Sequence, residues 1–164
     1  DTLKAKFPNN LILVDLKTMD AGEYEAEPFY KAGADICTVL GASGIATIKG
    51  VIAAAKKYGK ECQVDMINVD NKEALAKEAV AAGAQIIGVH TGLDAQAAGA
   101  TPFEDLASIA ALNTGAKISV AGGVKAATAQ QVKDAGAAII VAGAAIYGAA
   151  DPAASAAEIT AIAH

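Results

Sequence analysis

The feature that most constrains this fold is a rhythm of short apolar runs, each separated from the next by a stretch with helical spacing. The runs are almost continuously apolar, which is typical of parallel strands covered by helices. They recur at intervals of about 20 to 30 residues, the spacing of consecutive βα units. The predicted strands are Leu11–Lys17, Asp35–Leu40, Cys62–Ile67, Gln85–His90, Ile118–Ala121 and Ala138–Ala142. We therefore expect a single α/β domain with a parallel sheet.

Glycines recur where each predicted helix gives way to the next strand. They are Gly33, Gly59, Gly83, Gly115 and Gly136. Glycine reaches the left-handed conformation of a helix C-cap with little strain, so this position favours it. Residues 71–82 illustrate the pattern: apolar residues share one face, Asp70 or Asn71 can cap the start, and Gly83 can cap the end.

The charge balance bears on the class of partner. The chain has 164 residues, a net charge of −5 and 13 basic residues, all of them lysine. An acidic chain without a basic stripe is a poor binder of nucleic acid, so we expect none. No apolar run approaches the ~20 residues of a membrane span, and no signal-peptide pattern is present, so we expect no membrane partner. Cys37 and Cys62 lie inside apolar runs, which predicts buried thiols in a reducing cytoplasm.

Three charged residues cluster near the end of the first predicted strand: Asp15 and Lys17 belong to the strand, and Asp20 lies in the loop that follows it. Alternation along a strand would place Asp15 and Lys17 on one face, about 7 Å apart. Two carboxylates and an ammonium group at a strand end can bind a divalent cation and stabilise an oxyanion. The alternative interpretation is a solvated strand end with a salt bridge.

Two further polar residues, His90 and Asp65, end predicted strands. His90 can move protons near neutral pH, although a single histidine at a strand end is often only a hydrogen-bonded core residue. Asp65 can order the charged cluster or ligate a metal indirectly. It can equally be a structural acceptor for the turn that follows it.

Two glycine-containing turns follow the last two predicted strands. Gly122 and Gly123 stand in the first turn, and Gly143 and Ala144 in the second. Such turns allow backbone N–H groups to approach a phosphate, and barrel enzymes often bind phosphate after their last two strands. The alternative is two tight strand-to-helix turns. Because the chain has no arginine, phosphate binding would rest on the backbone, with Lys125 nearby.

Several motifs together resemble the hexulose-6-phosphate synthases, which belong to the orotidine-monophosphate-decarboxylase-like barrels. The matching segments are Asp-Leu-Lys-Thr-Met-Asp-Ala-Gly at 15–22, Ala-Gly-Ala-Asp at 32–35, Thr-Val-Leu-Gly at 38–41, His-Thr-Gly-Leu-Asp-Ala-Gln-Ala at 90–97, Val-Ala-Gly-Gly-Val-Lys at 120–125 and Val-Ala-Gly-Ala-Ala-Ile at 141–146. They span nearly the whole chain in family order. The Asp-x-Lys-x-x-Asp motif is specific for the suprafamily, and the His-Thr-Gly-Leu-Asp run narrows the match further.

This resemblance implies a TIM-barrel-derived fold and an aldolase-type reaction. Members are (β/α)₈ barrels and usually homodimers. They add formaldehyde to ribulose 5-phosphate through a metal-stabilised enediolate, with Mg²⁺ as cofactor. The implied roles are metal ligation by Asp15, enediolate stabilisation by Lys17, a reach across the dimer interface by Asp20, proton transfer by His90, and phosphate binding by the backbone of Gly122, Gly123, Gly143 and Ala144. Asp65 is expected to be catalytic together with Lys17, Asp20 and His90.

Two departures from the family pattern matter. The related 3-keto-L-gulonate-6-phosphate decarboxylases typically carry arginine where this chain has Thr91 and Ala144, which favours the synthases over the decarboxylase alternative. The six βα units correspond to strands 3–8, so the first two units are expected to be lacking. We expect the barrel to be incomplete or closed by self-association through open sheet edges, with impaired activity. A non-catalytic engineered barrel fragment is a further alternative.

Overall fold

The structure is a computed structural model that describes residues 2–163. All six predicted strands are present, within a few residues of the expected bounds. They are β1 (Leu13–Thr18), β2 (Ile36–Leu40), β3 (Glu61–Asp65), β4 (Ile86–His90), β5 (Lys117–Ala121) and β6 (Ile139–Val141). Their order in the sheet is their order along the chain, and the pairs β1–β2, β2–β3 and β5–β6 are parallel. The α/β prediction is therefore confirmed.

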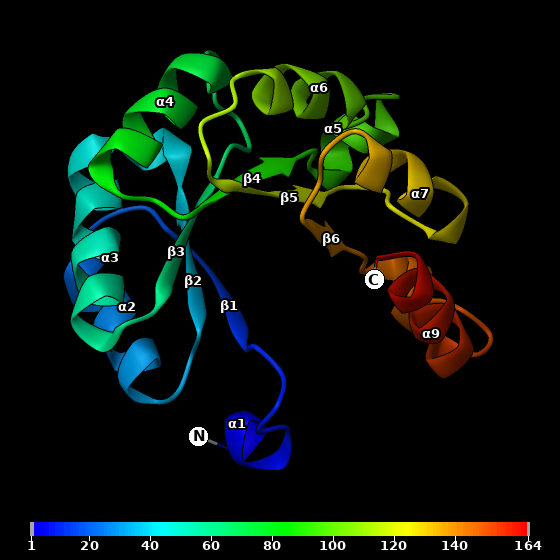
Figure 1. Ribbon diagram of the computed structural model, residues 1–164, viewed down its shortest axis with the longest axis horizontal. Coiled ribbons are helices and arrows are strands. Elements are labelled where there is room, and N and C mark those ends of the chain that lie inside the picture. The colour runs from blue at the N-terminus through cyan, green and yellow to red at the C-terminus, as the bar shows by residue number, and fades with distance from the viewer. Residues whose placement is uncertain (1, 164) are drawn as a thin grey trace. The chain divides into compact units, whose positions relative to one another are not determined.

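Helices fill the segments between the strands (Figure 1). They are α1 (Thr2–Lys6), α2 (Gly22–Lys31), the 3₁₀ helix η1 (Gly41–Ser43), α3 (Ile45–Tyr58), α4 (Lys72–Ala82), α5 (Leu93–Ala97), α6 (Phe103–Ala111), α7 (Ala126–Asp134), α8 (Ala144–Tyr147) and α9 (Pro152–Ala163). None of the helices within residues 2–163 is long and apolar enough to cross a membrane.

The glycine pattern read from the sequence is confirmed at the helix ends. All five expected glycines have positive φ angles, namely Gly33, Gly59, Gly83, Gly115 and Gly136. At α4 the start is also as predicted, because the side chain of Asn71 accepts a hydrogen bond from the backbone N of Ala74 at 3.0 Å. Local sequence signals therefore determine where α4 begins and ends.

The chain divides into two compact units, the first ending at Ile87 and the second beginning at Gly88. In the first unit, α2 and α3 pack against β1, β2 and β3, and α4 packs beside α3 (Figure 1). Small residues allow this packing, because a Cβ on Gly50 of α3 would lie 2.9 Å from the backbone N of Glu23 in α2. The core of this unit includes Val39 and Val64, both fully buried.

The two cysteines belong to this core. Cys37 on β2 and Cys62 on β3 are register partners, and both are fully buried free thiols. Burial raises the pKa of Cys37 to about 11 and that of Cys62 to about 12. The prediction of buried thiols is confirmed, and neither group is a reactive thiolate near neutral pH.

A charged junction fastens the start of β2 to its surroundings. The carboxylate of Asp35 accepts hydrogen bonds from Lys4 Nζ at 2.8 Å, Lys60 Nζ at 2.6 Å and the backbone N of Ile12 at 2.9 Å. Burial alone would raise the pKa of Asp35, but the two lysine hydrogen bonds outweigh it and hold the pKa well below its ordinary range. As an ionised group, Asp35 therefore ties α1 and the residues just before β1 and β3 to the start of β2.

The second unit contains the end of β4, β5, β6 and helices α5 to α9. Within it, α9 packs against α7 and α8, and α6 packs against β5. The buried side chains include Leu106, Val120, Val132 and Ile159. Lys133 of α7 donates a hydrogen bond to the carbonyl of Ile162 at 2.9 Å, which fixes the end of α9.

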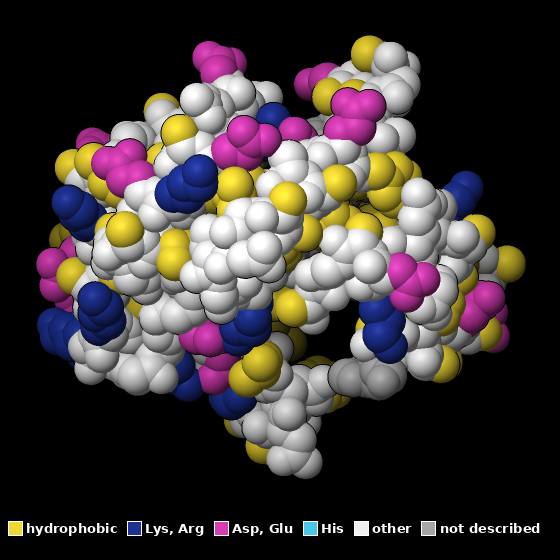
Figure 2. Space-filling model, turned by 45° about the horizontal axis from the view of Figure 1, so that its top comes forward, with side chains coloured by type: hydrophobic (Ala, Val, Ile, Leu, Met, Phe, Trp, Pro, Cys, Tyr) yellow, Lys and Arg dark blue, Asp and Glu magenta, His cyan; other side chains and the backbone are white. Residues whose placement is uncertain are grey.

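Lysine and carboxylate side chains are interspersed on the face drawn in Figure 2, with apolar side chains between them. Charges of opposite sign at short intervals offset one another's field. This distribution agrees with a chain of modest net negative charge.

Candidate active site

The end of β1 is irregular, and this irregularity places Lys17. Val14 pairs with Cys37 and Thr18 pairs with Val39, so β1 contains two more residues than β2 across the same stretch. Lys17 has a φ of 48°, a left-handed conformation that non-glycine residues adopt rarely. We expected regular alternation to bring Asp15 and Lys17 together. They do meet, but through this bulge, which re-aims the lysine side chain.

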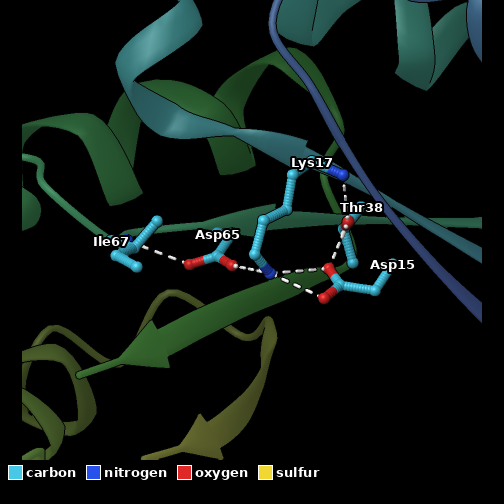
Figure 3. A network of polar contacts seen from close by, with 5 residues as sticks. All are labelled: Asp15, Lys17, Thr38, Asp65 and Ile67. Atoms are coloured by element: carbon cyan, nitrogen blue, oxygen red, sulfur yellow. Dashed lines mark hydrogen bonds and ion pairs between the residues drawn. The ribbon is translucent and has the colours of Figure 1, made fainter. Parts of the chain in front are cut away.

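The Lys17 ammonium group lies between two carboxylates (Figure 3). Its Nζ is 2.6 Å from Asp15 Oδ2, 2.9 Å from Asp15 Oδ1 and 3.2 Å from Asp65 Oδ2. Burial would lower the pKa of Lys17, but the hydrogen bonds and charges of Asp15 and Asp65 outweigh it and raise the pKa. Lys17 is therefore a fixed cation at neutral pH.

The two carboxylates around Lys17 differ in exposure. The Asp15 side chain is 55% exposed, whereas that of Asp65 is 3% exposed. Asp65 also accepts a hydrogen bond from the backbone N of Ile67 at 2.9 Å, so it both pairs with Lys17 and fixes the turn after β3. Asp65 therefore orders the charged cluster and is also an acceptor for the following turn. Indirect metal ligation by Asp65 stays a prediction. The exposed Asp15 is the carboxylate that remains within reach of a ligand.

Thr38 of β2 is part of this network, and reasoning from the sequence gave it no role. Its hydroxyl accepts a hydrogen bond from the backbone N of Lys17 at 2.9 Å and donates one to Asp15 Oδ1 at 2.8 Å. The side chain is buried, at 1% exposure. The available signal was a polar residue inside an otherwise apolar predicted strand.

Asp20 stands apart from these contacts. It is exposed, and its carboxylate accepts a hydrogen bond from the backbone N of Ala21 at 2.8 Å, just before α2. The structure thus brings Asp15, Lys17 and Asp65 together and leaves Asp20 at the adjoining loop. The role expected for Asp20 in a partner's site stays a prediction.

The second unit carries a cavity of about 400 Å³ at the ends of its strands. Every residue predicted for this unit lines it, namely His90, Gly122, Gly123, Gly143 and Ala144. Lys125 lines it as well, and Lys125 and His90 are the ionisable residues able to carry positive charge in its wall. A pocket of this size suits a small phosphorylated ligand.

The glycines of this cavity are not equivalent. A Cβ on Gly122 would lie 2.5 Å from the carbonyl O of Thr91, and its φ is 113°, so only glycine fits there. At Gly123 a Cβ would lie 3.2 Å from Gln96 Oε1, and at Gly143 it would lie 3.4 Å from Tyr147 Cε1. The close approach of Thr91 and the positive φ therefore explain the glycine at position 122 without a ligand. Gly123 also has a positive φ, of 69°, whereas at Gly143 the space alone would admit a Cβ at ordinary contact distance.

Gln96 is a second residue that reasoning from the sequence left without a role. Its Nε2 donates a hydrogen bond to the carbonyl of Thr91 at 2.7 Å, and it lines the cavity. The backbone N of Thr91 in turn donates to the carbonyl of Ala121 at 3.1 Å. These bonds fix the segment after β4 against the Gly122 turn.

The carboxylate, imidazole and thiol side chains limit how a metal ion could be held. Within residues 2–163 there is no group of three or more His, Cys, Asp or Glu side chains placed to hold a metal ion. Mg²⁺ often uses only one or two carboxylates, with water and substrate oxygens completing its shell. The exposed carboxylate of Asp15 fits such a partial role, whereas a cage built wholly of protein ligands does not fit.

Residues 1–159 match the model of the orotidine 5′-phosphate decarboxylase / HUMPS family. A 3-hexulose-6-phosphate synthase from Methylomonas aminofaciens is 73% identical over 163 residues, which cover 99% of this chain and 78% of that protein.

Solved structures show the same likeness. A 3-hexulose-6-phosphate synthase from Salmonella typhimurium superposes with a TM-score of 0.94 at 41% identity, covering 99% of this chain and 77% of the other. A 3-keto-L-gulonate-6-phosphate decarboxylase from Vibrio cholerae gives a TM-score of 0.83 at 27% identity, covering 99% and 76%. The TIM-barrel-derived fold class expected from the sequence is confirmed, and the synthase is the more similar of these two structures.

Proposed function

Because this chain belongs to the orotidine 5′-phosphate decarboxylase / HUMPS family and is by family an aldehyde-lyase, we propose that it adds formaldehyde to ribulose 5-phosphate. The product is a hexulose 6-phosphate. The observation that carries the proposal is the Lys17 ammonium group, fixed between Asp15 and Asp65 at a strand end. A fixed cation at that place suits a reaction in which negative charge develops on a carbonyl oxygen.

The reaction needs a carbanion equivalent next to a carbonyl. Loss of a proton from the carbon beside the ribulose carbonyl gives an enediolate, and that carbon then forms a bond to the formaldehyde carbon. The formaldehyde oxygen takes up a proton to complete the product. Lys17 offsets the charge on the enediolate oxygen, and because two carboxylates already orient it, little reorganisation accompanies the step.

His90 is the proposed proton carrier. It ends β4 and lines the cavity of the second unit. An imidazole exchanges protons efficiently near neutral pH, as both the removal and the return of a proton require.

The phosphate of the substrate suits the second unit. We assign its binding to backbone N–H groups of Gly122, Gly123, Gly143 and Ala144, because these turns line the cavity with few side chains in the way. Lys125 is exposed on the cavity wall and adds a positive charge. A phosphate dianion is stabilised both by amide dipoles and by such a charge.

Mg²⁺ is the proposed cofactor, and the carboxylate of Asp15 would hold it, with substrate and water supplying further oxygens. Bound there, the ion would add positive charge near the developing oxyanion. Asp15 is suited to this because its carboxylate is more than half exposed, at 55%. Its two oxygens are also oriented by Lys17 and Thr38.

We also propose that copies of the chain associate, with Asp20 reaching a partner's site. Within residues 2–163, β1 is the first strand in the sheet order and its neighbour is β2. Leu13, the first residue of β1, is 38% exposed, and Leu11, two residues before the strand, is 69% exposed. An exposed apolar edge strand recruits further strands. Light scattering that gives the mass of a single chain would contradict this proposal.

The test of the proposed reaction is an assay of ribulose 5-phosphate consumption with Mg²⁺, run with and without formaldehyde. We expect consumption only when formaldehyde is present, with loss of activity after chelation. A parallel assay supplies 3-keto-L-gulonate 6-phosphate and measures carbon dioxide. Carbon dioxide release without formaldehyde-dependent consumption would assign the decarboxylase reaction. Phosphate binding without either turnover would favour a non-catalytic fragment.

A further inference from the structure

The Thr38 hydroxyl joins two groups on the neighbouring strand (Figure 3). It donates to Asp15 Oδ1 at 2.8 Å and accepts from the backbone N of Lys17 at 2.9 Å. A threonine hydroxyl has one proton, so giving that proton to Asp15 leaves only its lone pairs for Lys17. The hydroxyl can therefore make both hydrogen bonds at the same time, in one orientation.

Each partner of Thr38 has reason to move without it. Lys17 has a φ of 48°, a conformation that costs a non-glycine residue free energy unless its surroundings hold it. The Asp15 side chain is 55% exposed, so solvent competes for its oxygens. Thr38 itself is fixed, because it is 1% exposed and its position on β2 is register-paired with Gln63 on β3.

We propose that Thr38 is a positioning residue that holds the Asp15–Lys17 pair in its working geometry, an inference that rests on the roles proposed above for that pair. Through one hydrogen bond Thr38 holds the backbone of the β1 bulge, and through the other it orients the carboxylate that faces Lys17. It acts through Asp15 and Lys17, without substrate contact of its own.

Three variants separate the hydroxyl from the rest of the side chain. Thr38→Val keeps the branched shape and removes both hydrogen bonds, whereas Thr38→Ser keeps the hydroxyl. Thr18→Val is the matched control. Thr18 is a threonine 1% exposed on β1, and its Oγ1 has no hydrogen-bond partner within the described structure. Any general effect of placing valine in a buried threonine site appears in this control.

The first readout does not depend on turnover. Brief acetylation followed by mass spectrometry gives the reactivity of the Lys17 amine relative to that of exposed Lys77 in the same molecules. We expect Thr38→Val to raise this ratio about fivefold, because the ammonium leaves its carboxylates more often. Thr38→Ser and Thr18→Val should stay near the parent value. A general loss of stability would affect both lysines, so the ratio isolates positioning.

The second readout is steady-state kinetics with ribulose 5-phosphate and formaldehyde. We expect Thr38→Val to lower kcat roughly ten- to a hundredfold with KM for the sugar phosphate nearly unchanged, since misplacement of the reacting groups affects the chemical step. Thr38→Ser should recover most of that loss.

The outcomes separate this proposal from the proposed function. If the parent chain shows no turnover, the proposed reaction fails, and the acetylation ratio alone decides the role of Thr38. An unchanged ratio in Thr38→Val, or Thr38→Ser behaving like Thr38→Val, would overturn the positioning role.

Discussion

The candidate functional residues of the two units differ in kind. In the first unit they are charged side chains: Asp15, Lys17 and Asp65 form one network, and Thr38 binds two of them. In the second unit, the cavity wall depends on positions where side chains are small or missing, as at Gly122, Gly123 and Gly143. The candidate site of the first unit therefore depends on particular functional groups. The cavity of the second unit depends on the space left where larger side chains are absent.

This difference predicts two kinds of mutational response. Removing a group from the network of the first unit should impair the chemical step and leave most of the fold intact. Adding a group to the glycine turns of the second unit should disturb folding or phosphate binding. The experiments below test the contrast, beginning with the largest expected effect.

Replacement of Lys17 by alanine should abolish most activity. Because the ammonium is the fixed cation beside the reacting carbonyl in our proposal, we expect kcat to fall at least about a hundredfold. Lys57→Ala is the control, since Lys57 also pairs with a carboxylate, that of Glu27 at 2.6 Å, but with its side chain 53% exposed. Activity of Lys17→Ala within tenfold of the parent would remove the network from the mechanism.

Replacement of Gly122 by alanine should mainly affect stability. The added Cβ would lie 2.5 Å from the carbonyl O of Thr91 at a φ of 113°. We expect the free energy of unfolding to fall by at least about 2 kcal/mol. Gly115→Ala is the control, because φ there is 83° and nothing lies within 4 Å, so only about 1 kcal/mol should be lost. Urea unfolding measures both, and equal losses would contradict the close approach.

Replacement of Asp35 by asparagine tests whether the first unit also depends on charge for its stability. At neutral pH we expect a loss of about 1–3 kcal/mol, since hydrogen bonds from Lys4 and Lys60 to a charged acceptor are lost. The folded pKa of Asp35 lies below its ordinary value of 3.8. The contribution is therefore present above that value and declines as pH falls through the range beneath it.

The measurement is the difference in Tm between the parent and Asp35→Asn, followed from neutral pH into acid. The difference should narrow below about pH 4. Asp70→Asn, at an exposed position, is the matched control and should change Tm little. A difference that stays constant across this pH range would show that the ionised carboxylate is not what fastens β2.

Replacement of Lys125 by alanine should have the smallest effect. If backbone groups provide most of the phosphate binding, loss of this exposed charge should raise KM for the sugar phosphate about fivefold with little change in kcat. The effect should diminish as salt is added. Lys77→Ala is the control lysine outside the cavity. A much larger increase in KM would mean that the second unit also relies on a charged side chain.

The local features of this fold were readable from the sequence. The strand positions, the glycines at helix ends and the Asn71 cap of α4 each depend on a few consecutive residues, and the structure confirms them. Gly122, Gly123, Gly143 and Ala144, which line the cavity of the second unit, were also singled out, because small residues after strands are a local signal. Their role in phosphate binding stays a prediction.

Features that join distant segments could not be read in this way. The bulge at Lys17 depends on how β1 pairs with β2. The residue types at positions 15–20 do not predict a positive φ at a lysine. The link from Thr38 to Asp15 crosses 23 positions of sequence. The Asp35 junction was hidden for the same reason, since its lysines come from α1 and from the turn before β3.

The buried thiols of β2 and β3 provide a way to measure local unfolding in this protein. Both cysteines of the chain, Cys37 and Cys62, lie in the first unit. A thiol reagent can modify them only after the first unit opens around β2 and β3, because both side chains are fully buried. The rate of labelling therefore reports the rate at which the first unit opens. The second unit contributes no thiol to this labelling, so its unfolding can be followed with a different probe.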